Sequence, residues 1–472
     1  MNATGNRLSR LFYASGVVNY ALKDAAFGAF VLFYYKQVLG LSGTLTGLAI
    51  ALSILFDAVT DPLVGAWSDR LRGPWGRRHP LMLASVLPLA LCFIAMFSPP
   101  DGVLHSQALL FSWLLGSVIA LRTALTFFMV PYLALGAELS DDYHERTRLA
   151  GVRTNLGWFV GVLVPSTSLI LIFQESQGTD GRFIVDNYHS YGLLSAVGVA
   201  LFSAICIRGT WGYISQLGSP KEPVDSNLVR DILTTFRNAN FRFLVILDTA
   251  IGGVAGIIGA LLMVTYTYFW QLDTAEISLL FAGPPLIAVL LVTSSASAVN
   301  RLLEKQQLLR LSCIVTAVNA AWLTPLKLWG ALPEADNLVF VLVFLNYAIH
   351  VTFVILRTVS NHALLADVAD EQALASGQRQ EGVMFAAAFF AAKFVSGFGY
   401  LVAGPYLDLI GLESHMLPGE APESTIWGLG LMMGPGIALL MLIPVWMSYR
   451  LDLSLARHKQ VREALADQRA GA

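Results

Sequence analysis

The chain has 472 residues, of which 56% are hydrophobic and only 13% are charged. This composition excludes an ordinary soluble protein and indicates a polytopic α-helical membrane protein. A net charge of −2 gives no reason to expect nucleic acid as a partner.

Apolar runs of roughly 20 residues, the length that crosses a bilayer as a helix, divide the chain into about twelve spans. The predicted spans are 11–38, 44–68, 80–98, 107–137, 147–173, 190–208, 241–270, 275–298, 308–328, 337–366, 382–409 and 425–449. Lys and Arg gather in alternate loops. By the positive-inside rule, this pattern predicts an integral plasma (inner) membrane protein with both termini in the cytoplasm.

A long polar stretch, 209–240, lies midway along the chain and predicts a cytoplasmic linker. It separates two six-helix halves, 1–208 and 241–450, and a cytoplasmic tail, 451–472, follows. An internal echo supports this division, because LALGAELSDDYHER resembles HALLADVADEQALA about 229 residues later. In both copies the acidic residues are predicted to close an even-numbered helix, as expected for parallel repeats.

The second span carries two carboxylates, Asp57 and Asp61, four residues apart in an otherwise apolar run. Residues at i and i+4 share a helix face, so both acids are predicted to point the same way. A charge inside the bilayer is costly, and a cation or proton shared between the acids explains the pair. The alternative is solvation at a kink opened by Pro62 and Gly65, which is itself typical of helices that line a transport path.

Further charged residues interrupt other spans: Lys23 and Asp24 in the first, Arg153 in the fifth and Lys393 in the eleventh. Ionisable groups inside a membrane typically mark a substrate or ion pathway. The alternative for each is a structural pair with a neighbouring helix. Lys393 stands alone in FFAAKFVSGFG, so we expect it to face the interior and to meet an acid from the opposite half.

Spans seven and ten hold further polar and aromatic groups. Gly252 and Gly256 form a G-x-x-x-G pattern that predicts close helix packing. The aromatic residues Tyr266, Tyr268 and Trp270 lie where an interfacial belt is expected, and this prediction is favoured over the alternative of a substrate platform. Asn346 and His350 are one turn apart, and the sequence leaves open whether they form a packed pair or line a cavity.

Four segments of the chain resemble the glycoside–pentoside–hexuronide:cation symporter family of the major facilitator superfamily. They are DAVTDPLVG, VPYLALGAEL, DYHERTRLAGVR and ADVADEQALASGQRQEGVMF…AAK. The resemblance covers nearly the whole chain. It implies the all-α, 12-helix major facilitator fold, transport by alternating access rather than enzyme activity, and a monomer in the lipid bilayer. It also implies no cofactor other than a coupling ion, H⁺ or Na⁺.

By this resemblance, Asp57 and Asp61 bind the coupling cation, which includes the possibility of Na⁺. Thr126, one turn before Met129, and Thr60, which points away from the acids by about 100°, are candidate helpers from their helix positions. The residues implied to lie at or beside the sugar site are Lys23, Asp24, Arg153 and Lys393. The stretch from Gly65 resembles the superfamily's loop between helices two and three. The residues predicted to control the conformational change are Asp69, Arg70, Arg77, Arg78, Glu138, Asp367, Arg379 and Glu381.

Two positions depart from the pattern of melibiose permease, a member of this family: Met129 replaces a third carboxylate and Leu133 replaces a sugar-stacking tryptophan. Na⁺ requires several hard oxygens, whereas a proton requires one carboxylate that titrates near neutral pH. The sequence therefore favours H⁺ over Na⁺. The predicted function is symport of a cation with a small polar solute, a sugar or glycoside.

Two alternatives remain. The first is a cation-coupled transporter of a lysolipid or another amphiphile. The second is a membrane-embedded transferase that uses a diphosphate, because acid pairs at i and i+4 also hold Mg²⁺–diphosphate. That chemistry needs a second acid cluster at the same depth, and Asp367, Asp370 and Glu371 are instead predicted to close a span beside a loop.

Overall fold

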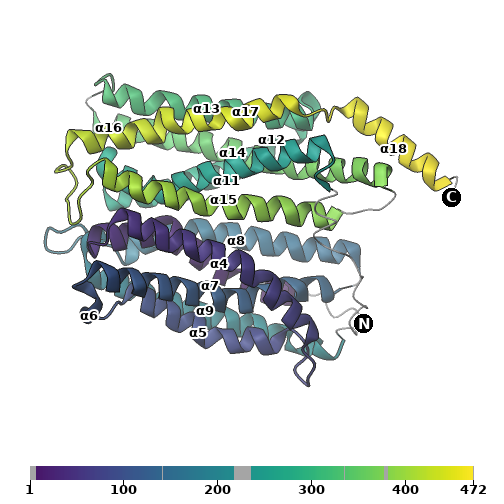
Figure 1. Ribbon diagram of the computed structural model, residues 1–472, viewed down its shortest axis with the longest axis horizontal. Helices are drawn as coiled ribbons and strands as arrows, with labels where there is room; N and C mark the ends of the chain where they lie inside the picture. Colours follow the sequence, from purple (N-terminus) through teal and green to yellow (C-terminus); the bar gives the residue numbers. More distant parts are fainter. Residues whose placement is uncertain (1–6, 141, 217–234, 334, 377–380, 471–472) are drawn as a thin grey trace.

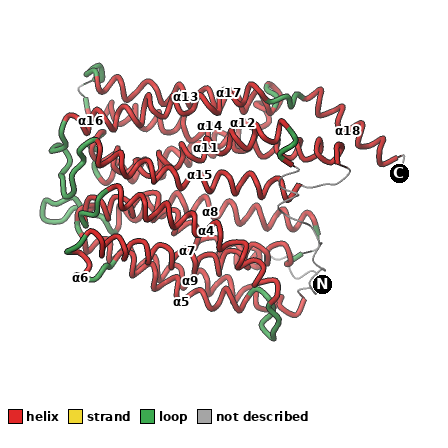
Figure 2. The backbone as a smooth tube through the Cα atoms, viewed as in Figure 1, coloured by secondary structure: helices red, strands yellow, loops and turns green. Residues whose placement is uncertain are grey.

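A computed structural model describes residues 7–140, 142–216, 235–333, 335–376 and 381–470. Long helices run side by side along the longest axis of the molecule (Figures 1 and 2). Eleven helices of the described part are long and apolar enough to cross a membrane. The helix α15 (Glu381–Leu409), which has 29 residues, corresponds to the remaining predicted span.

The first half begins with an interrupted span, in which short helical pieces are joined by turns of 3₁₀ or π-helix. Its pieces are α1 (Arg7–Ala14), η2 (Ser15–Val17), α2 (Val18–Ala25), η3 (Ala26–Phe30), α3 (Val31–Phe33) and η4 (Tyr34–Val38). The elements that follow are α4 (Gly43–Arg70), α5 (His79–Phe97), α6 (Asp101–Leu104), α7 (Gln107–Glu138), α8 (Tyr143–Leu171), η5 (Gly181–Phe183), α9 (Val185–Thr210) and η6 (Trp211–Gln216).

The second half forms the other side of the bundle in Figure 1, where teal to yellow helices lie beside the purple and blue ones. Its elements are α11 (Ala239–Val264), η7 (Thr265–Phe269), α12 (Thr274–Leu302), α13 (Lys305–Leu328), α14 (Asp336–Ser376), α15, α16 (Glu423–Leu431), η8 (Met432–Gly436) and α17 (Ile437–Arg450). A last helix, α18 (Leu455–Ala470), occupies the predicted tail.

Two predicted boundaries differ from the structure. The helix α9 runs to Thr210 and η6 follows it, so helical structure extends into the predicted linker, of which 217–234 lie outside the described residues. The prediction that both acidic repeats close a helix is wrong. The helix α7 ends at Glu138, but α14 is 41 residues long and carries its acids, Asp367 to Glu371, inside the helix.

The two halves meet closely where α4 packs on α15. A Cβ atom added to Gly43 would lie 2.5 Å from the backbone oxygen of Gly404, and one added to Gly47 would lie 2.3 Å from that of Tyr400. Only glycine permits so close an approach of two helix backbones. This contact fixes which face of α15 is turned towards α4.

On its other side, α15 packs against α11, so it lies between one helix of each half. A Cβ atom added to Gly252 would lie 2.6 Å from the oxygen of Ala392, and one added to Gly256 would lie 2.2 Å from that of Ser396. The prediction that these glycines serve close helix packing is therefore confirmed. With both sides of α15 engaged, Lys393 reaches across to the first half.

Polar contacts tie the halves together at the end of the bundle opposite Arg7 and Arg450. Asp408, near the end of α15, accepts hydrogen bonds from Lys36 Nζ at 2.8 Å, from the Gly43 backbone at 2.8 Å and from the backbone and hydroxyl of Thr44, both at 2.7 Å. Four donors on one carboxylate make a strong link between the halves. The structure is therefore closed at this end.

A second contact at the same end comes from the loop that carries Arg182, a fully buried arginine. Its guanidinium donates to the Thr267 hydroxyl at 2.8 Å and to the Leu272 oxygen at 3.0 Å, and it pairs with Asp180. Burial opposes ionisation of Asp180, but hydrogen bonds and charge from Arg182 lower the pKa of this carboxyl overall.

The predicted aromatic belt of Tyr266–Trp270 is wrong. Tyr266, Tyr268 and Trp270 are all buried within the protein. Tyr268 donates its hydroxyl to Gln37 Oε1 at 2.9 Å, and Tyr266 stacks edge-on against Tyr347. These rings face inward because η7 belongs to the closed end, where the interior of the bundle offers them hydrogen-bond and ring partners.

Candidate functional site

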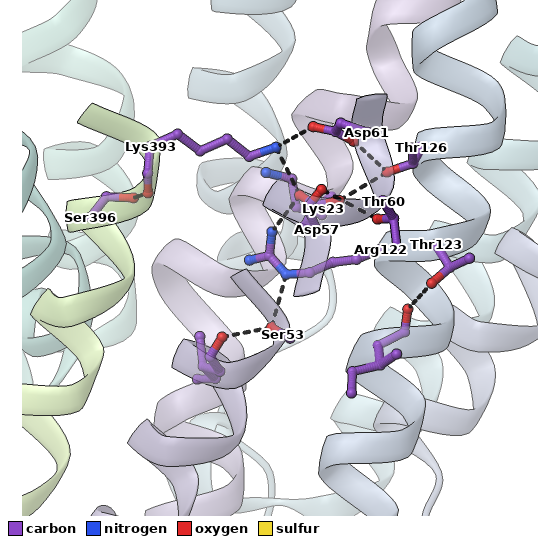
Figure 3. Close-up of polar contacts among 12 residues, drawn as sticks. Lys23, Ser53, Asp57, Thr60, Asp61, Arg122, Thr123, Thr126, Lys393 and Ser396 are labelled. Atoms are coloured by element: carbon purple, nitrogen blue, oxygen red, sulfur yellow. Dashed lines mark hydrogen bonds and ion pairs between the residues drawn. The ribbon is translucent and has the colours of Figure 1, made fainter. Parts of the chain in front are cut away.

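The site begins with the two acids of α4. Asp57 and Asp61 project from the same face, as the spacing predicts, and point into the space between α4, α7 and α15 (Figure 3). The side chain of Asp57 is 9% exposed and that of Asp61 is 36% exposed. The pair therefore runs from a buried position to one that solvent can reach.

Thr126 on α7 lies against both acids. Its hydroxyl oxygen is 2.9 Å from Asp57 Oδ1 and 2.8 Å from Asp61 Oδ1. A hydroxyl has a single proton, so it can donate to only one of these oxygens at a time. Three oxygens therefore converge at one point, which places the predicted helper beside the acids.

Lys393 on α15 reaches the other oxygens of the same acids. Its Nζ atom is 2.9 Å from Asp57 Oδ2 and 2.7 Å from Asp61 Oδ2. The expectation that Lys393 meets an acid of the opposite half is confirmed. One ammonium group thus links the second half to both carboxylates of the first (Figure 3).

The structure adds a residue that the sequence reasoning missed, Arg122 on α7. Its guanidinium is buried, with NH1 3.3 Å from Asp57 Oδ2 and Nε 2.9 Å from the Ser53 hydroxyl, and it lies 4.9 Å above the Phe27 ring. The sequence does contain a signal for this residue, because Arg122 is a lone arginine in the apolar run 107–137. Ionisable residues within a membrane span indicate functional sites, and that argument, used above for Lys393, applies equally to Arg122.

Two acids and two bases therefore face one another in the middle of the bundle. The repulsion between Asp57 and Asp61, which motivated the prediction of a shared cation, is offset here by Lys393 and Arg122. Paired and hydrogen-bonded charges are the form in which ionisable groups persist away from water. Lys393 and Arg122 therefore occupy positions that a cation bound to these acids would otherwise take.

Lys23 and Asp24 form a neighbouring pair on α2. The Lys23 ammonium is buried, pairs with Asp24 Oδ1 and lies 4.0 Å above the Tyr20 ring. The Asp24 side chain is 53% exposed. Although these neighbours leave the helix in different directions, the long lysine side chain bends back to its partner.

A cavity of about 610 Å³ lies between the two halves. Asp24 and Arg153 line it from the first half, and Tyr347 and His350 line it from the second. Of the four residues implied for the sugar site, Asp24 and Arg153 line the cavity. Lys23 pairs with Asp24, and Lys393 pairs with Asp57 and Asp61. Arg153 also approaches the Tyr13 hydroxyl to 3.5 Å.

Of the residues predicted to control the conformational change, four contact one another within the first half: Asp69, Arg77, Arg78 and Glu138. Arg78 is buried, with NH1 2.7 Å from Asp69 and NH2 2.6 Å from Glu138, so it joins α4, α5 and α7. Arg77 also reaches Glu138, at 3.2 Å, whereas Arg70 is exposed. This network makes the end of the first half that lies near Arg10 a rigid unit.

The corresponding cluster of the second half centres on Asp367 of α14. Lys305 Nζ lies 2.8 Å from both of its carboxylate oxygens, and His458 of α18 lies 3.6 Å away. Of the remaining predicted residues, Arg379 lies outside the described residues, as does the side chain of Glu381. The two halves thus each carry an ion-pair cluster at the same end.

The chain is similar to known membrane transport proteins over nearly its whole length. The family model described as MFS/sugar transport protein matches residues 12–454. An uncharacterised symporter of Synechocystis sp. is 24% identical, covering 97% of this chain and 96% of its own. The isoprimeverose transporter of Lactiplantibacillus pentosus is 21% identical, covering 84% and 80%.

A solved structure shows the same fold. The xylose transporter XylE from E. coli, in its inward-open conformation, superimposes with a TM-score of 0.64 at 14% identity, covering 97% of this chain and 98% of that one. The predicted all-α major facilitator fold is therefore confirmed. These related proteins are transporters rather than enzymes, which removes the support for a membrane-embedded transferase.

Proposed function

Because the chain belongs to the MFS/sugar transport protein family, within the glycoside–pentoside–hexuronide:cation symporters, we propose that this cation-coupled symporter carries a neutral sugar or glycoside together with H⁺. The solute occupies the cavity between the halves. The coupling ion acts at Asp57 and Asp61. The two halves alternate in exposing the cavity to the two sides of the membrane.

The observation that carries this proposal is the bridge from Lys393 to both acids. A cation that binds Asp57 or Asp61 takes an oxygen from the Lys393 ammonium and weakens the link between the halves. Ion binding therefore changes the relative free energies of the conformations, which is what coupling requires. Binding of the solute in the cavity between the same halves also shifts the relative free energies of the conformations.

The walls of the cavity support a sugar as the solute. Tyr20, Trp158 and Tyr347 offer aromatic faces, and Asp24 and Arg153 offer charged groups that hydrogen-bond hydroxyls. Apolar and aromatic walls with a few convergent polar groups are typical of small-molecule sites. The isoprimeverose transporter among the relatives adds weight to a glycoside.

Solute counterflow in proteoliposomes tests this proposal. Vesicles loaded with unlabelled sugar should take up the labelled sugar transiently, with xylose, glucose and isoprimeverose as probes. Empty vesicles provide the control. Exchange of lysophosphatidylcholine with no exchange of any of these sugars would overturn the sugar assignment in favour of an amphiphile.

Arg153→Ala is expected to raise the half-saturating sugar concentration roughly 10- to 100-fold, because a hydrogen bond to a charged group contributes about 1.5–3 kcal/mol. Arg148→Ala is the matched control, since that side chain lies on the same helix and is 66% exposed. Counterflow at several sugar concentrations measures the effect. Equal behaviour of the two variants would exclude Arg153 from the solute site.

The choice of H⁺ leads to a separate expectation. Na⁺ needs several hard oxygens at once, and the oxygens that meet at this site are those of the two carboxylates and the Thr126 hydroxyl. Replacing Na⁺ by choline at fixed pH should therefore leave uptake nearly unchanged, whereas a protonophore should abolish accumulation. A steep loss in choline that Na⁺ alone restores would identify Na⁺ as the coupling ion.

A further inference from the structure

Arg122 of α7 is a charged residue to which the proposed function assigns no role. Its side chain is 6% exposed, so the guanidinium lies almost wholly within the protein. NH1 lies 3.3 Å from Asp57 Oδ2, Nε lies 2.9 Å from the Ser53 hydroxyl, and the central carbon lies 4.9 Å from the centroid of the Phe27 ring. These three partners all belong to the first half of the chain. Arg122 is therefore a fixed part of that half and not a bridge to the second.

Ser53 extends the face of α4 that carries the two acids (Figure 3). It lies four residues before Asp57, as Asp57 lies four residues before Asp61, so the three side chains share one helix face. Ser53 is fully buried, and its hydroxyl donates to the Ile50 backbone oxygen at 2.6 Å. That bond uses its only proton, so Ser53 accepts from Arg122 with a lone pair. The guanidinium thus holds two oxygens of this face.

The cations of the protein hold part of the oxygen set that a metal ion would need. Arg122 is bonded to Ser53 Oγ and Asp57 Oδ2, and Lys393 lies against Asp57 Oδ2 and Asp61 Oδ2. The oxygens that remain are Asp57 Oδ1, Asp61 Oδ1 and Thr126 Oγ1. Na⁺ binds through several hard oxygens at once, whereas a proton bonds to one. A proton therefore finds an oxygen here, whereas a metal ion has to displace a cation that is tethered to the chain.

The balance of charge at the site also depends on Arg122. With Asp57 and Asp61 ionised, Lys393 and Arg122 bring these four groups to a net charge of zero. Without Arg122 the other three groups carry a net charge of −1. A charge that is not compensated is costly away from water, and a bound monovalent cation would restore neutrality. The guanidinium thus supplies the positive charge that a bound metal ion would otherwise bring.

We propose that Arg122 sets the ion specificity of this transporter, as a tethered cation that keeps Na⁺ away from Asp57. The inference rests on the proposed function and deepens it, because it identifies a residue that restricts the coupling ion to H⁺. Lys393 comes from the second half, so alternation of the halves separates it from the acids. Arg122 and Asp57 lie in the same half and stay together, so the exclusion of Na⁺ holds throughout the transport cycle.

Removal of the guanidinium charge should create a Na⁺ site. Arg122→Met removes the charge and the donors and keeps an apolar stem, and Arg122→Gln removes the charge but keeps an amide that can donate to Ser53. The melting temperature of each purified variant is measured in equal concentrations of NaCl and of choline chloride at the same pH. Na⁺ should raise it by roughly 1–4 °C in both variants, because an ion that binds only the folded protein stabilises it.

Counterflow in proteoliposomes gives a second readout, which a purely structural role of Arg122 would not move. In the two uncharged variants, Na⁺ should lower the half-saturating sugar concentration roughly 5-fold or more, because the binding of ion and solute is coupled. The wild-type protein and Arg122→Lys, which retains the charge, should change less than about 2-fold. Arg148→Gln is the matched control for loss of a positive charge, since this side chain of α8 is 66% exposed.

The outcomes separate this inference from the proposed function. If neither uncharged variant responds to Na⁺ while the wild-type protein exchanges sugar without Na⁺, the role of Arg122 is overturned and the proposed function stands. A wild-type response to Na⁺ in both readouts would overturn the inference together with the choice of H⁺. An equal response in Arg148→Gln would overturn the inference alone. If the wild-type protein exchanges no sugar, the proposed function falls, and the melting temperatures still decide whether Arg122 excludes Na⁺.

Discussion

Asp57→Asn is expected to abolish accumulation of solute against its gradient, so that internal and external concentrations only become equal. The amide cannot hold a transferable proton or the charge that competes for Lys393, so the ion no longer biases the conformations. Asp57 also accepts from Arg122 at 3.3 Å, and its replacement leaves a buried cation without its acid. Counterflow, which needs no ion gradient, should persist in part.

Asp61→Asn should show the same loss of accumulation with a smaller effect on stability. Its side chain is 36% exposed, so solvent can compensate for part of the lost ion pair, whereas Asp57 is nearly buried. Asp101→Asn, an exposed acid at the start of α6, is the matched control. Accumulation ratio, counterflow and melting temperature are measured for each variant. If both Asn variants still concentrate solute, the acids of α4 are not the coupling site.

Lys393→Ala is expected to reduce uptake by more than about 100-fold and to lower the melting temperature. It removes the ammonium that bridges the halves at 2.7 and 2.9 Å, so Asp61 loses this cation and Asp57 keeps Arg122. Breaking one side of a buried ion pair costs roughly 3–5 kcal/mol, and less here because Lys393 is 37% exposed. The exposed Lys459→Ala is the control for loss of a lysine.

A double variant separates the bridge from direct contact with solute. Lys393→Ala/Asp61→Asn removes one charge of each sign and leaves the Asp57–Arg122 pair in place. We expect this variant to recover stability and counterflow relative to Lys393→Ala, without recovering accumulation. Strictly additive losses in the double-mutant cycle would mean that Lys393 and Asp61 act independently. A selective loss of sugar affinity in Lys393→Ala would instead support the sugar-site role that the family resemblance implies.

The acid pair illustrates what could be predicted. The spacing of Asp57 and Asp61 is enough to place both on one helix face, since helix periodicity acts within a few residues. Thr126 could be chosen as a helper from its place one turn before Met129, and its hydroxyl lies within 2.9 Å of both acids. The partner of Lys393 could be predicted as an acid of the other half, but not which acid.

Arg122 and the aromatic residues of η7 illustrate what could not. Arg122 meets Asp57 from a different helix, 65 residues along the chain, and no local pattern predicts that contact. Tyr266–Trp270 have the composition of an interfacial belt, and a single sequence does not tell a ring that faces lipid from one that faces a neighbouring helix. Their burial depends on which helix packs beside them.

The sequence by itself determined the class of protein, the positions of the spans, the shared face of Asp57 and Asp61 and the close packing at Gly252 and Gly256, because hydrophobic length and helix periodicity are local properties of the chain. The tertiary structure decided the balance of charge at the site. Asp57 meets Arg122 across 65 residues and Asp61 meets Lys393 across 332, so their neighbours depend on how whole helices pack.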